Sequence, residues 1–408
     1  MDLVTTISVV IAITAVLSWI SLRWLKTTTI GVPALTAIAV VVLVSGGDRL
    51  SSIRHTCADL SSVFGTPQFF SCVVIPLLLF TAASCFAFNP IGRKQITSSG
   101  VAIFRGMLTA LGVAGIVSYI SHGSIGWSEC ILFGTLASAT DSVGQARLFA
   151  HSSASGNLRQ QLMGESIINS AFASALFIAI ESVAWKNALL MAVQAGGGVI
   201  LGLAAGWAGA RAIDGLRDRR TTALVVCTLL LIAFLTSRYF GLAGPLEAVV
   251  SGFAFRVFNH DRAPREIEES HSPEFWNAIA DIENSVLFVL LGLSVAANGM
   301  TSIAITAGLA GFLATVLVRF ASTRIPVFQL SKRDHWERPS ALLRALGGFR
   351  GGIPIALALA ISYPATRSWI LGATFIVTVL STVVQGGMIG WVAPFGGRRT
   401  GQPNLAAH

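Results

Sequence analysis

Two acidic side chains lie inside long apolar runs, and they are the groups in this sequence best suited to chemistry. Asp141 lies in the segment SATDSVGQ, and Glu165 lies in the polar stretch MGESIINS. A charged side chain at the centre of a bilayer costs about 2.5–3.5 kcal/mol on insertion scales. Such acids are retained where they contact water, an ion or an opposite charge, so the two segments indicate a transport site.

Further polar side chains accompany Glu165 at helical spacing. Asn169 lies one turn beyond Glu165, and Ser170 lies one turn beyond Ser166, so the four residues form one stripe of a helix. Asp141 is expected at similar depth in the preceding span, which runs in the opposite direction. The stripe and Asp141 can therefore meet across two helices.

An arginine at the same depth offers a partner for one of the acids. Arg319, in a later span, is expected to pair with Glu165 and to fix two helices against each other. The pairing leaves Asp141 as the acid able to hold either a proton or a cation. The hydroxyl oxygens of Thr140 and Ser166, with backbone carbonyls released where the helix of Asp141 breaks, would suit a small hard cation.

Structural alternatives stay open beside these roles. A purely structural ion pair is an equally good interpretation of Glu165, and Ser166 and Ser170 could bond carbonyl groups of their own helix. The other acids in or near apolar runs are interpreted as interfacial or snorkelling side chains. They are Glu129, Glu181, Glu247, Asp281 and Glu283.

The composition is that of an integral membrane protein. Charged residues make up only 12% of the chain, about half the roughly 25% of a soluble domain. Apolar runs of about 18–25 residues, long enough to cross a bilayer as helices, recur along the sequence. The net charge of +9 does not indicate nucleic acid, because most basic residues fall in short loops between the runs. We therefore predict an all-α polytopic membrane protein.

The apolar runs predict about thirteen transmembrane helices. Their approximate bounds are 3–22, 29–46, 68–88, 98–120, 126–150, 160–185, 188–213, 221–240, 242–258, 273–297, 301–323, 345–362 and 367–394. Arginine and lysine concentrate in the loops after odd-numbered spans, which puts the N-terminus outside and the C-terminus in the cytoplasm. One transmembrane domain is expected over 1–394, followed by a short cytoplasmic tail over 395–408.

Thirteen spans fit two inverted six-helix repeats with one linker helix between them. Transporters built this way bind substrate near the midplane, on broken helices. The fifth helix of the first repeat carries the polar triplet Thr140–Ser142. The fifth helix of the second carries Leu346–Pro354, whose glycines and proline suit a continuous helix poorly. Arg105 and Arg319 lie in the corresponding fourth helices.

Six short segments, in order, resemble motifs of the cation:proton antiporter-1 (sodium/proton exchanger) family of monovalent cation/proton antiporters. Each alone is a weak signal, but six in one order over nearly the whole chain are specific. Leu77–Phe80 resembles LLF, Ser138–Asp141 ATDP, Gly164–Asn169 GESLxND, Phe288–Leu293 FLxxGL, Gly347–Gly352 with Ala356–Leu359 GGxRGxxxxALAL, and Val384–Gly386 VQG.

The resemblance implies the sodium/proton antiporter fold and a secondary active transporter that exchanges a monovalent cation for H⁺ by alternating access. Na⁺ is the first choice of cation, and Li⁺ or K⁺ are alternatives. A core at about 98–185 and 301–394 would move against a dimerisation scaffold at about 1–88 and 188–297, in a homodimer. The expected setting is the bacterial plasma (inner) membrane, with no cofactor. The sequence contains no HExxH motif, no GxSxG motif and no metal-spaced Cys/His cluster, so nothing in it suggests an enzyme.

The resemblance also assigns roles to individual residues. The implied roles are cation binding for Asp141, Thr140 and Ser166, an ion-site position for Ser170, an ion pair for Glu165 with Arg319, and support of the helix crossing for Asn169 and Arg350.

Ser170 is the informative departure from the family pattern. The family's principal ion- and proton-binding aspartate occupies this position, and Ser142 likewise replaces a proline. Serine does not titrate at physiological pH and offers only a neutral oxygen. The loss of one of two carboxylates is expected to weaken cation binding and to alter its coupling to protons.

Three hypotheses follow from this departure. In the first, which we prefer, Asp141 alone serves cation and proton in turn, and Ser170 is a neutral ligand. One shared acid would give one-for-one, electroneutral exchange. In the second, the chain is a diverged carrier for another solute, or a proton-linked carrier without sodium. In the third, it is a transport-inactive homologue that acts as a sensor or membrane scaffold.

Overall fold

A computed structural model describes residues 66–85, 93–142, 144, 145, 149, 156–181, 187–213, 218–260, 273–324, 343, 344, 346–386 and 388. Every regular element among these residues is a helix, which confirms the predicted all-α class. The first two predicted spans and the predicted tail lie outside the described residues, so the number thirteen is not counted.

The described helices follow the predicted spans closely. In chain order they are α4 (Pro67–Phe69), the π-helical turn η3 (Phe70–Val74), α5 (Ile75–Ser84), α6 (Arg93–Ile120), α7 (Trp127–Ser138), α9 (Gly156–Glu181), α10 (Ala188–Ala212), α11 (Arg219–Tyr239), α12 (Gly244–His260), α13 (Pro273–Asn298), α14 (Ser302–Arg324), α16 (Gly352–Leu359), α17 (Pro364–Leu380) and the π-helical turn η6 (Ser381–Gln385). Within the described part of the chain, seven helical stretches are long and apolar enough to cross a membrane.

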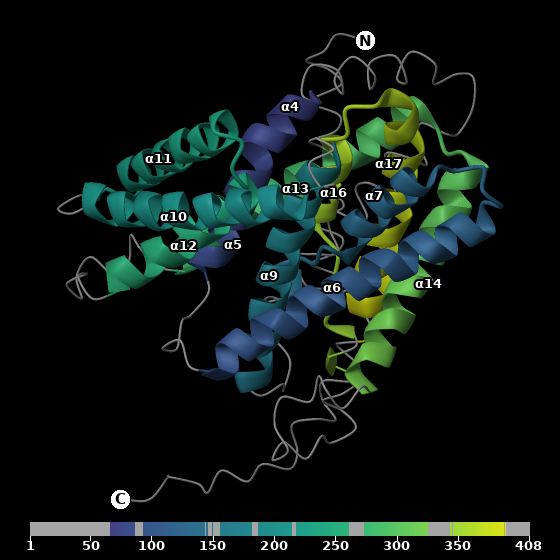
Figure 1. The fold of residues 1–408 in the computed structure, drawn as a ribbon, viewed down its shortest axis with the longest axis horizontal. Helices are drawn as coiled ribbons and strands as arrows, with labels where there is room; N and C mark the ends of the chain where they lie inside the picture. Colours follow the sequence, from purple (N-terminus) through teal and green to yellow (C-terminus); the bar gives the residue numbers. More distant parts are fainter. Residues whose placement is uncertain are drawn as a thin grey trace, which may run out of the picture.

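The helices form two groups, with α13 between them (Figure 1). In the first group α10 and α11 pack on α12, and α12 packs on α5. In the second group α6 packs on α7, α9 and α14, and α14 packs on α17. Helix α13 contacts α5 of the first group and both α16 and α17 of the second. It therefore lies at the boundary between the two groups.

Small residues let α10 and α12 approach closely. A β-carbon at Gly198 would lie 2.7 Å from the carbonyl oxygen of Ala243, and one at Gly202 would lie 2.6 Å from that of Glu247. Gly206 is equally close to α12. Glycines at this four-residue spacing make a flat helix surface, which is a common basis for helix association in membranes.

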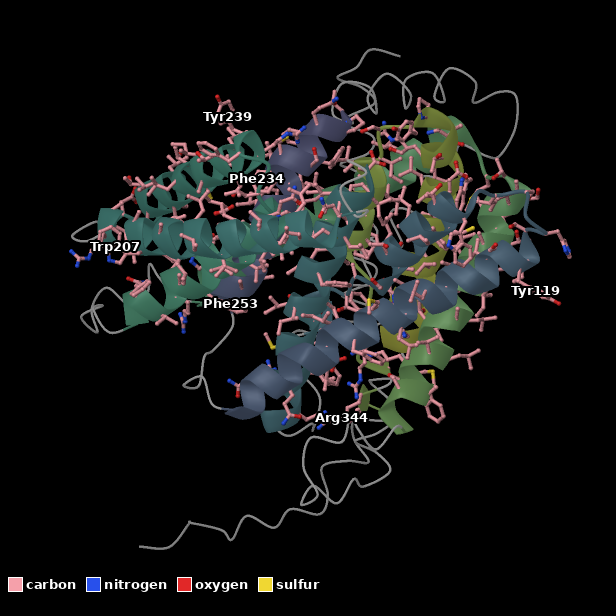
Figure 2. All side chains as sticks on the ribbon, viewed as in Figure 1. Tyr119, Trp207, Phe234, Tyr239, Phe253 and Arg344 are labelled. Carbon is pink, nitrogen blue, oxygen red and sulfur yellow. The ribbon has the colours of Figure 1, made fainter. Side chains whose placement is uncertain are left out.

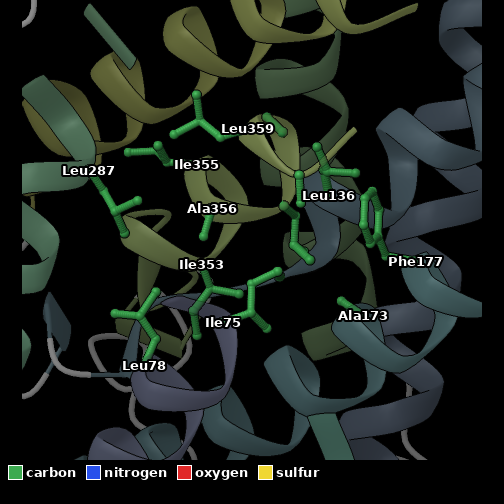
Figure 3. Packing of buried hydrophobic residues seen from close by; sticks show 14 of the residues in the cluster. Ile75, Leu78, Leu136, Ala173, Phe177, Leu287, Ile353, Ile355, Ala356 and Leu359 are labelled. Atoms are coloured by element: carbon green, nitrogen blue, oxygen red, sulfur yellow. The ribbon is translucent and has the colours of Figure 1, made fainter. Parts of the chain in front are cut away.

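A buried apolar cluster fills the boundary between the two groups (Figure 3). Ile75 and Leu78 of α5 lie beside Leu287 of α13 and Ile353 and Ile355 of α16, and all five are at most 4% exposed. In a bilayer such close packing, rather than removal of apolar surface from water, holds helices together. The cluster packs α5, α13 and α16 against one another.

The outer surface also carries large apolar side chains. Trp207, Tyr119 and Tyr239 project from the molecule in Figure 2, and the two tyrosines are 81% and 86% exposed. Ile200 on α10 is 71% exposed. Such a surface fits hydrocarbon rather than water, and tyrosines at the ends of α6 and α11 suit the interface between lipid and water.

Two spans are interrupted where the sequence predicted broken helices. Helix α7 ends at Ser138, and the next residue is extended. Helix α16 begins only at Gly352, after the non-helical segment 348–351. The Asp141 amide donates a hydrogen bond to the Phe349 carbonyl at 2.8 Å. The two non-helical segments therefore cross, and backbone groups that have left their helices bond each other inside the protein.

Candidate functional site

The carboxyl group of Asp141 lies at this crossing. Asp141 is only 5% exposed. Its Oδ1 accepts a hydrogen bond from the Gly144 amide at 3.0 Å, and its Oδ2 accepts one from the Asn284 side-chain amide of α13 at 3.3 Å. A β-carbon at Gly351 would overlap Oδ2, so the crossing leaves room for this carboxylate only with glycine at that position. Three separate segments thus surround one buried acid.

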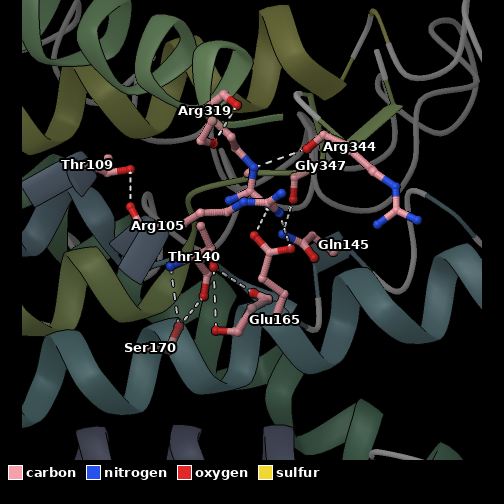
Figure 4. A network of polar contacts seen from close by, with 12 residues as sticks. Arg105, Thr109, Thr140, Gln145, Glu165, Ser170, Arg319, Arg344 and Gly347 are labelled. Carbon is pink, nitrogen blue, oxygen red and sulfur yellow. Dashed lines mark hydrogen bonds and ion pairs between the residues drawn. The ribbon is translucent and has the colours of Figure 1, made fainter. Parts of the chain in front are cut away.

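Helix α9 supplies two serines to the non-helical residue Thr140. The Ser166 hydroxyl donates to Thr140 Oγ1 at 2.9 Å. The Thr140 amide donates to Ser170 Oγ at 3.3 Å, and the Ser170 hydroxyl donates to the Thr140 carbonyl. Figure 4 shows these bonds between the α9 stripe and the non-helical segment. The structure therefore brings Thr140, Ser166 and Ser170 together beside Asp141.

Ser170 has a specific chemical reason to be a serine here. Its hydroxyl accepts from one backbone group of Thr140 and donates to the other. A hydroxyl can do both, whereas an ionised carboxylate can only accept. Both backbone groups belong to the interrupted part of the span, where no helical partner remains. Ser170 thus completes the backbone hydrogen bonding of the break.

Glu165 pairs with two arginines. Arg319 Nη2 of α14 lies 3.2 Å from Glu165 Oε1, and Arg105 Nη1 of α6 lies 3.0 Å from Oε2. All three side chains are buried (Figure 4). Arg319 Nε also donates to the Arg344 carbonyl at 3.1 Å. The charged network fixes α9 against α6 and α14. The sequence argument had not assigned Arg105 to it, although Arg105 and Arg319 occupy corresponding positions in the two predicted repeats.

Arg350 joins the two interrupted spans. Its Nε donates to the Ala137 carbonyl at 2.9 Å, near the C-terminal end of α7, and its Nη1 donates to the Gly348 carbonyl. Its backbone amide donates to Ser381 Oγ at 2.9 Å. The last carbonyls of a helix lack intrahelical partners and carry partial negative charge, so a guanidinium stabilises them. Arg350 therefore caps the helix that leads into the break.

Three further polar side chains lie near the crossing: Asn169, which the sequence analysis named, and Gln145 and Asn284, which it did not. Asn169 is buried against α6, where a β-carbon at Gly106 would lie 3.1 Å from its Oδ1. That oxygen has no hydrogen-bond partner, and the role of Asn169 as a support of the crossing stays a prediction. Gln145 and Asn284 were not anticipated. The Gln145 side-chain amide donates to the Gly347 carbonyl, and Asn284 reaches Asp141.

Two acids expected at the membrane interface are covered by neighbouring helices, one completely and one in part. Glu247 on α12 is 0% exposed, and neither of its carboxyl oxygens has a hydrogen-bond partner. Glu283 on α13 accepts a hydrogen bond from the Thr81 hydroxyl of α5 at 3.3 Å, and its Oε1 is buried without a partner. The snorkelling interpretation of Glu247 is wrong, and Glu283 is half-buried against α5. Position along a helix sets depth, but contacts with neighbouring helices decide which side of the helix is covered.

A buried carboxylate at the crossing of two broken helices, in a polytopic all-α membrane protein, defines the class of secondary transporters. The chain belongs to the sodium/hydrogen exchanger family, whose transmembrane family model matches residues 4–394. This confirms the resemblance found in the motifs and the prediction of a transporter rather than an enzyme.

Individual relatives agree with the family assignment. The Na⁺/H⁺ antiporter NhaP of Pseudomonas aeruginosa is 26% identical over 404 residues, which cover 93% of this chain and 94% of the relative. The Na⁺/H⁺ antiporter ApNhaP of Aphanothece halophytica is 25% identical over 352 residues, which cover 80% of this chain but only 64% of the relative.

A solved structure shows the same fold. The sodium proton antiporter MjNhaP1 of Methanocaldococcus jannaschii superimposes with a TM-score of 0.73 at 18% identity, over 99% of this chain and 100% of the matched one. A second structure of that protein, at pH 8, gives a TM-score of 0.68 over 95% of this chain and 100% of the matched one. The predicted antiporter fold is confirmed.

Proposed function

We propose that this chain exchanges a monovalent cation, Na⁺ in the first place, for a proton across a membrane by alternating access. The observation that carries the proposal is the buried Asp141 carboxylate at the crossing of two interrupted spans. Thr140 and Ser166 add hydroxyl oxygens from the adjoining segments. Hard cations prefer such oxygen ligands. Family membership and the Na⁺/H⁺ antiporters among the relatives support the choice of Na⁺.

In this proposal Asp141 holds the cation in one half of the cycle and a proton in the other. A protonated carboxyl carries no charge, so a cation binds well only after the proton has left. The two ions therefore compete for the same group. Ser170 contributes a neutral oxygen and no charge. Because both ions use the same acid in turn, one cation is exchanged for one proton and transport moves no net charge.

The ion pairs around Asp141 have a fixed role in the proposal. Both oxygens of Glu165 are engaged by guanidinium groups, so this acid holds helices together rather than the ion. Arg350 caps α7 and keeps the break in place. Because these groups are held by several segments at once, they can move as one body with the ion site.

The moving body would be the helix group formed by α6, α7, α9, α14, α16 and α17. The group formed by α5, α10, α11 and α12 would be the scaffold through which two copies form a homodimer. The loop charges support an outside N-terminus and a cytoplasmic C-terminus. The bacterial relatives support a location in the plasma membrane.

The test is transport by the purified protein in vesicles that carry a pH gradient and a pH-sensitive dye. Na⁺, Li⁺ and K⁺ are added in turn to wild type and to Asp141→Asn. We expect dequenching with at least one cation for wild type and none for Asp141→Asn, because the amide keeps the shape but can hold neither a cation charge nor a proton. Exchange retained by Asp141→Asn refutes the assignment of this acid.

The same experiment separates the alternatives. If wild type responds to none of the three cations, the exchange function is refuted and another solute or a silent homologue remains. Ser170→Asp then distinguishes these two, because recovery of Na⁺ exchange identifies a transporter that lost its activity with its second acid. A dye that reports membrane potential tests the one-for-one stoichiometry, which predicts no voltage from transport.

A further inference from the structure

Helix α13 presents two neighbouring polar side chains to two different partners. Asn284 points its amide at Asp141 Oδ2, at 3.3 Å. Glu283, the preceding residue, faces α5, where the Thr81 hydroxyl donates to its Oε2 at 3.3 Å. Consecutive residues on a helix are offset by about 100° around its axis, so one helix can serve both sides of the boundary. Glu283 is thus the acid one residue away from a side chain that contacts the ion site.

Glu283 is held in a way that leaves capacity for a further ligand. Its Oε1 is buried with no hydrogen-bond partner, and so is Asn284 Oδ1. Cys227 of α11 lies close enough to interact with Glu283 electrostatically. Among the described residues, the Thr81 hydroxyl and the Cys227 thiol are the groups that interact with this carboxyl, and neither is basic. A half-buried carboxylate with one buried, unpaired oxygen and no basic partner is a natural place for a mobile cation.

The balance of buried charge at the crossing favours a further acid. Among the described residues, the buried basic side chains around it are Arg105, Arg319 and Arg350, against the two buried acids Asp141 and Glu165. Three positive charges against two negative ones would repel an incoming cation. Glu283, when ionised, brings the set to neutrality before the cation arrives. This is the role that a second carboxylate on α9 would have played, and Ser170 cannot play it.

We propose that Glu283 is a second cation-attracting carboxylate of this transporter, and that with Thr81 it holds the monovalent cation at the boundary of α5 and α13 on its way to Asp141. The proposal rests on the cation exchange proposed above. It replaces the missing acid of α9 with an acid on α13. Since α13 contacts α5 of the first group and α16 of the second, a cation passing this boundary moves from the scaffold group to the helix group that carries Asp141.

The test compares variants that change charge without changing shape. Glu283→Gln keeps an oxygen that accepts from Thr81 but removes the charge, and Glu283→Asp keeps the charge. Glu247→Gln is the matched control. It removes another buried carboxyl, one that shares a helical stripe with Ala254 on the side of α12 facing α10. Each is reconstituted, and KM and the maximal rate for Na⁺ are measured at one pH.

We expect Glu283→Gln to raise the KM for Na⁺ about tenfold or more, because the cation loses one buried charge. Glu283→Asp should stay within about threefold of wild type, and Glu247→Gln should match wild type. Thr81→Val, which keeps every acid, should raise KM about threefold by removing the neutral ligand. Thr81→Val also tests the proposed cation position if Glu283→Gln does not fold.

Several outcomes overturn the proposal without touching the exchange function. An unchanged KM in Glu283→Gln, with Asp141→Asn inactive, removes Glu283 from the cation path. Equal damage in the Gln and Asp variants shows that shape rather than charge matters. An equal KM rise in Glu247→Gln shows a general effect of buried charge. An unchanged KM in Thr81→Val refutes the pairing of α5 with α13. If wild type itself carries no cation, the proposed function has failed.

Discussion

Replacing Ser170 by alanine tests whether this serine completes the break in the span that carries Asp141. The substitution removes the acceptor for the Thr140 amide and the donor to the Thr140 carbonyl. Both backbone groups are buried, since Thr140 is 0% exposed. A buried polar group left without a partner costs about 1–3 kcal/mol, so the pair costs about 2–6 kcal/mol. Ser170→Ala should therefore lower the free energy of unfolding by that amount.

Ser174 provides the matched control. It lies one turn further along α9, it is equally buried, and its hydroxyl has no hydrogen-bond partner. Replacing an unpartnered buried hydroxyl by a methyl group is neutral or stabilising. Ser174→Ala should therefore unfold at the same denaturant concentration as wild type or at a higher one.

The assay is reversible unfolding in mixed micelles, followed by tryptophan fluorescence, with vesicle transport measured on the same samples. Ser170→Asp should fall between wild type and Ser170→Ala, because the carboxylate still accepts from the Thr140 amide but no longer donates to its carbonyl. Equal stability of Ser170→Ala and Ser174→Ala would refute the reasoning. It would mean that water or a rearranged backbone satisfies Thr140 without the serine.

Three further predictions concern the residues around the site. Gly351→Ala should abolish exchange while leaving the helical circular dichroism unchanged, because the added methyl overlaps the carboxylate of Asp141; retained exchange would contradict the crossing geometry. Glu165→Gln should lower the free energy of unfolding by about 3–5 kcal/mol, because it leaves two buried arginines without a counter-charge; a loss below about 1 kcal/mol in the same micelle assay would contradict this. Gly202→Ala should cost about 1–3 kcal/mol by forcing α10 away from α12, whereas Gly196→Ala, with open space at its β-carbon, should be neutral; equal effects would refute the close packing.

The sequence correctly predicted features that depend on a single helix, such as which charged residues lie inside an apolar span and at what depth. Charged residues inside apolar runs marked Asp141 and Glu165, and matching depths selected Arg319 as the partner that lies 3.2 Å from Glu165. The same reasoning did not assign Arg105 to Glu165, and it had no means of finding Asn284. Depth along a helix follows from residue counting, but the direction in which a side chain points depends on how the helix is rotated against its neighbours.

The acids Glu247 and Glu283 show the same limit of what one helix's sequence can predict. A position near a span end or the lack of an assignable partner suggested contact with the interface. The packing of α12 on α10 covers Glu247 completely, and the packing of α13 on α5 covers one carboxyl oxygen of Glu283. Whether an acid near a helix end reaches water is decided by neighbours that are distant in sequence, and the sequence of its own helix does not contain that information.

What the sequence by itself determined is the class of protein, the extent of the described helices and the two places where spans break. These properties follow from local composition, because apolar length, glycine, proline and intramembrane charge act within one segment. The tertiary structure alone decided which groups meet at the breaks. Asp141 and Asn284 are 143 residues apart and share a hydrogen bond, and Ser170 bonds both backbone groups of Thr140. Such contacts depend on the order and rotation of packed helices, so the chemistry of the site is specified only when the whole bundle has formed.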